Sequence, residues 1–431
     1  MASMILAVLS AAQFLLALDY SIVYVALPVI ARDLHLDLPA AQWVVSAYAV
    51  PFAGLLLLGG RLSDRLGAGR LFLAAALLFG LASLAGGLAG SGALLLAARA
   101  VQGLAAALLQ PAILGLIGAR FQGSARTRAL SVWGAVGASG LAAGVVLGGL
   151  FTRYSWRWTF LVNVPVTLAC AAGAAIWLLT TARPRPSTSP LGRTLLTTTA
   201  AVAAALGLTL AGARGWSDWA TITPLAVAVL LGLLLIRPAL GLRPASLRTG
   251  TMAAALYMAS VGSEFYVVTL MLQNRDGYAP LQAGLAFLPL AALVTVGSSL
   301  TSGLVRRFGP ARTLAGGFLF AALGLAWLAV AGSSYPTGVL PGLVVSGAAH
   351  GVIYTAMFVL GARDVPAERQ SSAGATMTTA QYLTGAVAVA LLTLPLHGGA
   401  YGTAFWLTAG AAVAGAVVAL QRGQASLEAA Q

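Results

Sequence analysis

The sequence predicts an all-α protein that crosses a membrane many times. Of its 431 residues, 59% are hydrophobic and only 8% are charged, whereas about a quarter of the residues in a soluble domain are charged. The mean hydropathy is +0.92, and apolar runs long enough to cross a bilayer recur along the whole chain. These observations exclude an ordinary water-soluble domain.

The basic residues indicate the topology. All 24 of them are arginine, and 18 fall in loops on one side of the expected spans, five on the other and one, Arg99, inside a span. Because cytoplasmic loops carry an excess of arginine, both termini are expected in the cytoplasm. The all-arginine basic usage with abundant Ala, Leu and Gly indicates a GC-rich bacterial genome, so the bacterial inner membrane is the expected location. The net charge of +14 therefore reflects topology and does not indicate binding of nucleic acid. Fourteen spans are expected, near residues 4–30, 43–59, 71–90, 93–118, 129–151, 159–180, 194–212, 221–236, 250–272, 283–304, 313–331, 338–361, 372–395 and 402–420. The arginine-poor face is expected to carry an interfacial aromatic belt of Trp43, Trp156, Trp158, Trp216 and Trp219.

The sequence lacks the residues needed for a disulfide, a metal site or direct use of ATP. The single cysteine, Cys170, forms no intrachain disulfide, and the three histidines are scattered, so no metal site or cofactor is expected. The chain contains no lysine and no Gly-(four residues)-Gly-Lys loop, which excludes direct use of ATP. The first apolar run lacks a basic start and contains Asp19, so it is expected to be a retained span and not a signal peptide.

Two basic loops indicate an internal repeat. At an offset of 242 residues, Arg65, Gly67 and Arg70 match Arg307, Gly309 and Arg312. The expected organisation is a six-helix bundle at 1–182, a linker with two inserted helices at 183–249, and a second six-helix bundle at 250–431. Paired six-helix halves are typical of secondary transporters. A chance likeness between two short basic loops is the alternative.

Several motifs resemble those of the major facilitator superfamily, in its fourteen-span drug:proton antiporter branch. The segments that carry the resemblance are Leu18–Pro28, Gln42–Tyr48, the loop Gly60–Arg70, Arg99–Gly103, the glycines of Gly140–Gly149 and Trp156–Pro165. The resemblance implies the major facilitator fold and export by exchange with protons. It is incomplete, because Val145 stands where a proline is usual, and Ala68 and Gly69 stand where basic residues are usual.

Two acids lie inside expected spans. Asp19 and Glu264 fall about 21–22 Å along equivalent spans of the two repeats, at about 1.5 Å per residue, and each costs about 2.5–3.5 kcal/mol to bury. We expect them to flank one cavity. Low dielectric favours the protonated carboxyl group and a nearby cation favours the ionised one, so a proton and a cationic substrate can compete for the same group. The alternative is a neutral, hydrogen-bonded acid that only holds helices together.

Arg99 is expected level with Asp19. A guanidinium keeps its proton in a protein, so it must be paired or reach water. We hypothesise an Arg99–Asp19 pair, direct or through water, that is remade as the proton moves. The alternatives are a static buried pair or an arginine that extends to the outer interface. Gln102, one turn along the same face, is assigned to substrate binding.

Two further sets of residues are assigned to gating and packing. Asp64, Arg65 and Arg70, next to a tight turn at Gly67, are expected to pair across the cytoplasmic gap and with helix dipoles, although a simple membrane anchor is the alternative. A stripe of small residues in span 5 is expected to allow close helix packing; its members are Gly140, Gly144, Gly148 and Gly149.

Aromatic and amide side chains near the two acids are assigned to a pocket for flat cationic ligands, through cation–π contacts: Tyr20, Tyr24, Tyr257, Phe265, Tyr266 and Gln273. Packing or lipid exposure is the alternative for each. His350 is expected to be neutral and hydrogen-bonded, with pH sensing as a minority hypothesis.

The leading functional hypothesis is a proton-coupled antiporter that exports small hydrophobic or cationic compounds by alternating access, acting as a monomer. Its partners are a small-molecule substrate, protons and the lipid bilayer, without nucleic acid. An alternative keeps the fold and exports a lipid, a siderophore or a self-made antibiotic. A membrane-embedded transferase is disfavoured, because the spans supply only two carboxylates and one histidine.

Overall fold

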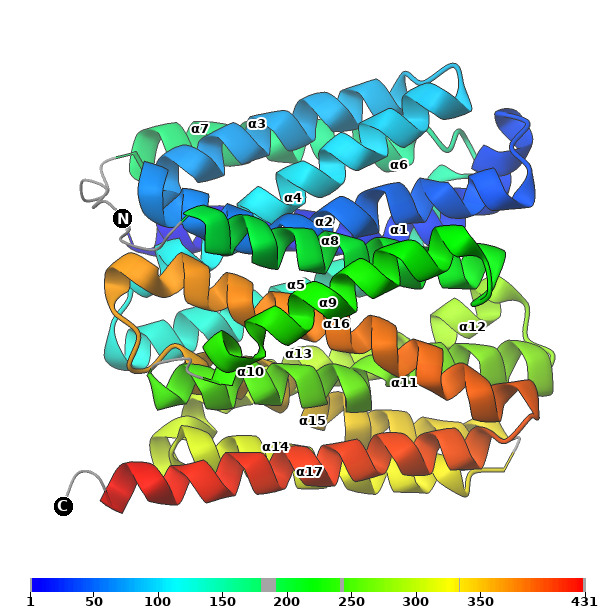
Figure 1. The fold of residues 1–431 in the computed structure, drawn as a ribbon. Coiled ribbons are helices and arrows are strands. Elements are labelled where there is room, and N and C mark those ends of the chain that lie inside the picture. Colours follow the sequence, from blue (N-terminus) through cyan, green and yellow to red (C-terminus); the bar gives the residue numbers. More distant parts are fainter. Residues whose placement is uncertain (1, 180–190, 241–243, 333, 429–431) are drawn as a thin grey trace. The chain divides into compact units, whose positions relative to one another are not determined.

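A computed structural model describes residues 2–179, 191–240, 244–332 and 334–428, which are largely helical (Figure 1). The helices of the first repeat are α1 (Ala2–Asp33), α2 (Leu38–Leu66), α3 (Ala68–Gly87), α4 (Gly92–Arg120), α5 (Gly123–Phe151), α6 (Trp158–Leu161) and α7 (Asn163–Trp177). Two helices follow, α8 (Leu191–Arg214) and α9 (Trp219–Leu240). The remainder comprises α10 (Ala245–Tyr257), η1 (Met258–Gly262), α11 (Ser263–Leu270), η2 (Met271–Arg275), α12 (Pro280–Ala286), α13 (Leu288–Phe308), α14 (Pro310–Ala329), η3 (Tyr335–Val339), α15 (Leu340–Gly361), η4 (Ala367–Arg369), α16 (Gln370–His397) and α17 (Tyr401–Glu428).

Twelve helical segments of the described residues are long and apolar enough to cross a membrane. The fold class predicted from the sequence, an all-α polytopic membrane protein, is therefore confirmed, but the count of fourteen spans is not. The two inserted helices are present as α8 and α9, yet their apolar stretches, Leu195–Ala211 and Trp219–Leu234, are shorter than the twelve. Part of the linker expected before α8 lies outside the described residues.

The helix bounds follow the 242-residue offset that the two basic loops suggested. Adding 242 to the bounds of α3, Ala68–Gly87, gives the bounds of α14, Pro310–Ala329. The turns before them also agree, because Gly67 has φ 91° and Gly309 has φ 79°, a region that favours glycine. Each of these glycines donates its N–H to the carbonyl four residues earlier, on Ser63 and Val305. The repeat thus extends from sequence to backbone conformation.

The chain forms two compact units. Unit 1 comprises Met1–Arg120, Gly140–Leu242 and Pro366–Thr379, and unit 2 comprises Phe121–Ser139, Arg243–Val365 and Ala380–Gln431. The first part of α5 therefore belongs to unit 2 and the first part of α16 to unit 1. From the sequence, two six-helix bundles and a linker are expected, with boundaries at 182/183 and 249/250. These boundaries describe the repeats and not the compact units, so they stay a prediction.

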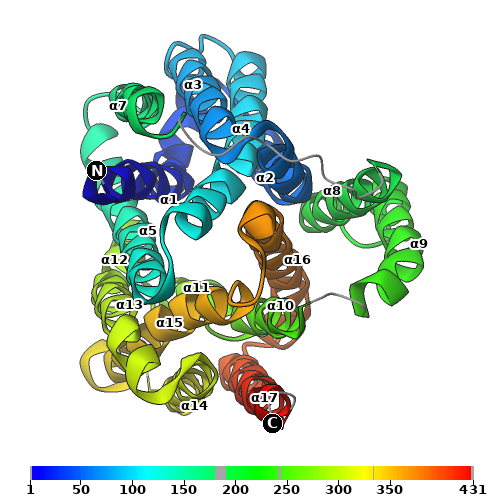
Figure 2. The same ribbon diagram turned by 90° about the vertical axis from the view of Figure 1, so that its left-hand side faces the viewer.

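Within each unit the helices pack side by side. In unit 1, α4 packs against α2 and α3, α7 packs against α1 and α3, and α8 lies between α2 and α9. In unit 2, α14 packs against α15 and α17, and α15 also packs against α13 (Figure 2).

One membrane span of unit 2 is interrupted twice. Two π-helical turns, Met258–Gly262 and Met271–Arg275, flank the short helix α11 within the span Ala245–Arg275. Such turns widen the helix locally and are frequent at functional sites. They place Tyr257 just before the first interruption and Glu264 just after it.

Candidate functional site: buried charges in both units

Asp19 and Arg99 form a direct ion pair inside unit 1. Arg99 Nη1 donates to Asp19 Oδ2 at 2.7 Å, and the two side chains are 1% and 0% exposed. The sequence expectation that these residues pair is confirmed. The alternative in which the arginine extends to the interface is wrong, because its side chain has almost no exposed surface.

Two amides complete the surroundings of the Asp19 carboxylate. Gln102 Nε2 donates to Asp19 Oδ1 at 3.2 Å, and Asn163 Nδ2 donates to the same oxygen at 2.7 Å. Gln102 also donates to Ser83 Oγ at 2.8 Å. Asp19 therefore accepts three hydrogen bonds, one of them from a cation, and these come from α4 and α7. This is the environment that stabilises an ionised carboxylate.

Arg99 has partners besides Asp19. Its Nε donates to the carbonyl oxygen of Val44 at 3.0 Å, and its Nη1 also donates to Gln102 Oε1 at 3.1 Å. The guanidinium lies 4.4 Å from the ring centroid of Tyr48, where the ring face attracts a cation. Gln102, which the sequence assigned to substrate binding, is fully buried within this network.

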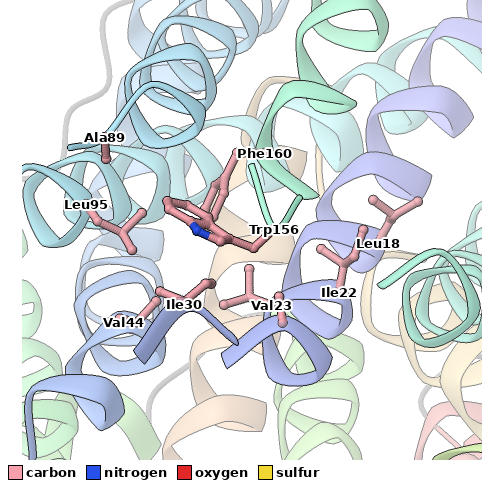
Figure 3. Packing of buried hydrophobic residues seen from close by; sticks show 10 residues of the cluster. Leu18, Ile22, Val23, Ile30, Val44, Ala89, Leu95, Trp156 and Phe160 are labelled. Carbon is pink, nitrogen blue, oxygen red and sulfur yellow. The ribbon is translucent and has the colours of Figure 1, made fainter. Parts of the chain in front are cut away.

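An apolar cluster packs beside the Asp19 network (Figure 3). It contains Leu18 and Ile22 of α1, with Trp156 and Phe160 in edge-to-face contact, and Figure 3 shows these two rings at its centre. Trp156 is 2% exposed, and its Nε1 donates to Asp33 Oδ2 at 2.8 Å. The indole is thus enclosed by the unit and bonded to a half-exposed carboxylate at the end of α1, and its place in an interfacial belt stays a prediction.

The glycine stripe of α5 lies against α1. A Cβ at Gly144 would lie 2.0 Å from Ser21 Oγ and 2.7 Å from the carbonyl oxygen of Leu18. A Cβ at Gly140 would lie 2.6 Å from the carbonyl oxygen of Phe14, and one at Gly148 would lie 3.0 Å from that of Ile22. These distances leave no room for a Cβ at Gly140 and Gly144 and little at Gly148, so the three glycines allow the backbones to approach. Gly149 lies in the same helix.

Glu264 has a different environment in unit 2. Its side chain is fully buried, and Ser346 Oγ donates to Oε1 at 2.6 Å, while Oε2 has no partner among the described residues. One turn along α15 from Ser346, His350 Nε2 is hydrogen-bonded to the Tyr257 hydroxyl, and its Nδ1 has no partner in the described part of the chain. This acid thus has one neutral donor where Asp19 has three donors.

An aromatic cluster forms around His350 and includes Phe265, the residue next to Glu264. Phe265 stacks on Phe287 with centroids 5.0 Å apart and meets the His350 ring edge-on at 6.0 Å. Tyr257 contacts Tyr354 at 5.6 Å. Tyr257 and Phe265, which the sequence assigned to a ligand pocket, therefore lie in one cluster with the histidine.

The other expected pocket residues are more accessible. Tyr20 and Tyr24 are 36% and 49% exposed, and their rings meet edge-on at 5.6 Å. Tyr266 and Gln273 are half-buried on α11 and η2. Each acid is enclosed by side chains of its own unit, so the shared chamber expected from the sequence stays a prediction.

Asp64, near the end of α2, contacts the start of α16 within unit 1. Its Oδ2 accepts hydrogen bonds from the backbone N–H of Ser372 at 3.2 Å and from the Ser372 hydroxyl. Beside it, Ser63 Oγ donates to Ser371 Oγ at 2.8 Å. Because a helix N-terminus carries partial positive charge, the acid is well placed there. Arg65 and Arg70 are exposed, and Gly67 forms the turn to α3.

Sequence reasoning missed the residues that complete these sites. Asn163 donates to Asp19, and Ser83 accepts from Gln102 beside it. Tyr48 lies against Arg99, Ser346 donates to Glu264, and Ser372 donates to Asp64. Asn163 was visible as a polar residue in an apolar run, but its partner is 144 residues away. Among the described residues, no group of three or more His, Cys, Asp or Glu side chains could hold a metal ion.

A duplicated helical membrane protein with one ion pair and a second acid buried inside its helical units has the features of a secondary transporter. Residues 9–389 match the model of the Major Facilitator Superfamily, and the chain belongs to this family.

Its relatives include named resistance and export proteins. It is 38% identical to the puromycin resistance protein pur8 of Streptomyces alboniger, over 90% of this chain and 80% of the relative. It is 35% identical to the cephamycin export protein CmcT of Amycolatopsis lactamdurans, over 88% of this chain and 82% of the relative.

Solved structures share the fold at low sequence identity. The human organic anion transporter MFSD10 has a TM-score of 0.74 at 15% identity, covering 97% of this chain and 99% of that one. The proton:xylose symporter XylE has a TM-score of 0.70 at 15% identity, covering 96% and 94%. These similarities show the fold alone.

Proposed function

We propose that the protein exports small hydrophobic or cationic compounds, antibiotics among them, in exchange for protons. The observation that carries the proposal is the pair of buried acids, one per unit, in a superfamily member whose relatives are named for antibiotic resistance and export. A charged group inside a membrane span is costly and is therefore expected to serve transport. The residues assigned to coupling are Asp19, Arg99 and Glu264.

The proposed cargo is a self-made or environmental antibiotic. The relatives named for puromycin, cephamycin and tetracenomycin C support this chemical class. Aromatic side chains near Glu264 suit flat, partly apolar molecules. Such molecules can stack on the rings, and cationic ones can also bind to the ring faces through cation–π contacts. Export of a lipid or a siderophore on the same fold is the alternative, and a transferase is disfavoured because superfamily members are transporters.

Alternating access is proposed to use the contact between α2 and the start of α16. The hydrogen bonds of Asp64 and Ser63 with Ser372 and Ser371 would hold this end of unit 1 closed. Arg65 and Arg70 would add charge beside the Gly67 turn. In the proposed cycle these bonds break when the substrate is taken up from the cytoplasm and form again when it is released outside.

The proposed topology keeps α8 and α9 as short spans, which gives fourteen spans in the bacterial inner membrane. Both termini are placed in the cytoplasm by the arginine distribution. The protein is proposed to belong to the fourteen-span drug:proton antiporter branch and to act as a monomer. Cysteine labelling at the α8–α9 connection, from each side of the membrane, tests the two added crossings.

The test of function is proton-driven uptake of ethidium into inside-out vesicles, whose outer face is the cytoplasmic one. Vesicles with wild-type protein are expected to accumulate the dye only when a proton gradient is present, and Glu368→Gln, at an exposed acid, is expected to behave as wild type. Asp19→Asn and Glu264→Gln are expected to lose the uptake that depends on the gradient. Normal uptake in both of these variants would refute the role of the carboxylates, and absence of dye transport in wild type would favour a specialised cargo.

A further inference from the structure

The two buried acids differ in what stabilises them, and this difference assigns separate roles. Asp19 accepts hydrogen bonds from Arg99, Gln102 and Asn163, at 2.7, 3.2 and 2.7 Å. A cation and two amide N–H groups stabilise the ionised form. In this arrangement none of the three donor nitrogens can accept a hydrogen bond from a protonated Asp19. Loss of the charge on Asp19 would also leave the buried guanidinium without its counter-ion.

Glu264 has the opposite surroundings. Its single donor is the neutral hydroxyl of Ser346 at 2.6 Å, and its second oxygen has no partner among the described residues. The structure records no ion pair for it in that part of the chain. A fully buried carboxylate with one neutral donor is poorly stabilised as an anion, so the protonated acid fits this site.

We propose that Glu264 is the group that carries the exchanged proton and that Asp19 stays ionised as the fixed partner of Arg99. This inference rests on the proposed proton exchange and deepens it by naming the proton site. In the exchange, the O–H bond of the Glu264 carboxyl group breaks and the proton leaves to water. The carboxylate that remains then pairs with the cationic substrate, so the charge at the site is balanced before and after.

The local fold suits such an exchange. Glu264 lies two residues after the π-helical turn Met258–Gly262, and a second π-helical turn follows α11. These turns lack the regular hydrogen bonds of an α-helix, so the segment that carries Glu264 can change its packing at small cost. Asp19, in contrast, lies within the long continuous helix α1.

Other titratable groups surround Glu264 and are the competing candidates. They are Tyr257 of α10, Tyr266 of α11, His350 and Tyr354 of α15, Tyr401 of α17 and, through its interaction with Tyr257, Tyr382 of α16. Only His350 titrates near neutral pH in its ordinary state. Since its Nδ1 has no partner in the described residues, its contribution has to be separated experimentally.

The first test needs no ligand. Infrared difference spectra of the purified protein, recorded during a pH titration, report the C=O stretch of protonated carboxyl groups. We expect Glu264→Gln to lose a band that wild type shows at neutral pH. Asp19→Asn combined with Arg99→Gln, which removes both charges together and avoids an unpaired guanidinium, is expected to keep that band. A band that persists in Glu264→Gln and disappears in the double variant would overturn the proposal.

The second test measures proton release when ethidium binds to detergent-solubilised protein. Wild type is expected to release one proton per dye, with an apparent dye affinity that changes about tenfold per pH unit while the acid is protonated. Glu264→Gln is expected to release none, and His350→Gln to release as much as wild type. Release that disappears in His350→Gln but not in Glu264→Gln would assign the proton to the histidine and reject the proposal. Failure of wild-type vesicles to show gradient-driven transport would instead reject the proposed function, because the infrared assignment is independent of transport.

Discussion

Replacing Asp64 by Asn is expected to weaken the contact between α2 and the start of α16. The carboxylate accepts two hydrogen bonds from Ser372, one at 3.2 Å from its backbone N–H and one from its hydroxyl. Making the acceptor neutral weakens each bond by about 1 kcal/mol, and loss of charge at the helix N-terminus removes about 0.3–1 kcal/mol more. The contact is thus destabilised by about 2–3 kcal/mol, which corresponds to an opening equilibrium shifted about 30- to 150-fold.

The assay follows a thiol that the closed contact protects. Ser371 is 2% exposed, and its hydroxyl accepts from Ser63 at 2.8 Å. Ser371→Cys is made in a Cys170→Ala background, since Cys170 is the single native cysteine. The rate of alkylation by an impermeant maleimide, added to inside-out vesicles, is expected to rise with the opening equilibrium when Asp64→Asn is added.

The matched control is Asp364→Asn, the same chemical change at an exposed acid that pairs with its neighbour Arg363. It is expected to leave the alkylation rate unchanged. Equal rates for Asp64→Asn and its parent, with full labelling after denaturation, would refute the role of Asp64 in closure. As an independent readout, Ser63→Cys with Ser371→Cys is expected to form a disulfide that stops dye efflux until it is reduced.

Three further predictions concern packing and the charged network. Gly144→Ala, whose Cβ would lie 2.0 Å from a side-chain oxygen, is expected to lose about 1–3 kcal/mol of stability, measured as a lower unfolding temperature in detergent. Gly410→Ala, with open space around the added Cβ, is expected to match wild type. Equal loss in both would contradict the close approach of α5 to α1. Arg99→Lys keeps the charge but loses the Nε bond at 3.0 Å to a backbone carbonyl, so proton-driven efflux is expected to fall by about tenfold or more, and unchanged efflux would show that the guanidinium geometry is not required. Trp156→Phe keeps the buried ring but loses its hydrogen bond to Asp33, so thermal unfolding is expected to reveal a loss of about 1 kcal/mol, since that acid is half exposed; no measurable change would indicate that water replaces the indole N–H.

The sequence predicted the helical membrane fold, the internal repeat and a pairing of Arg99 with Asp19, which the structure shows to be direct. Hydropathy and arginine placement act locally along the chain, so they report where helices begin and end. A lone charge in an apolar run also stands out without a structure, because burying it needs a partner. The count of fourteen spans was not confirmed, since the apolar stretches of α8 and α9 are short.

Only the tertiary structure decided which polar groups meet each acid. Asn163 and Ser346 are polar residues in largely apolar helices, and nothing in their sequence surroundings indicates that one donates to Asp19 and the other to Glu264. The hydrogen bond from Trp156 to Asp33, 123 residues away in the chain, likewise appears only in the folded structure. Hydropathy records how apolar a segment is. How well a buried charge is stabilised depends instead on the direction and distance of hydrogen-bond donors on other helices, and these are fixed only when the helices pack.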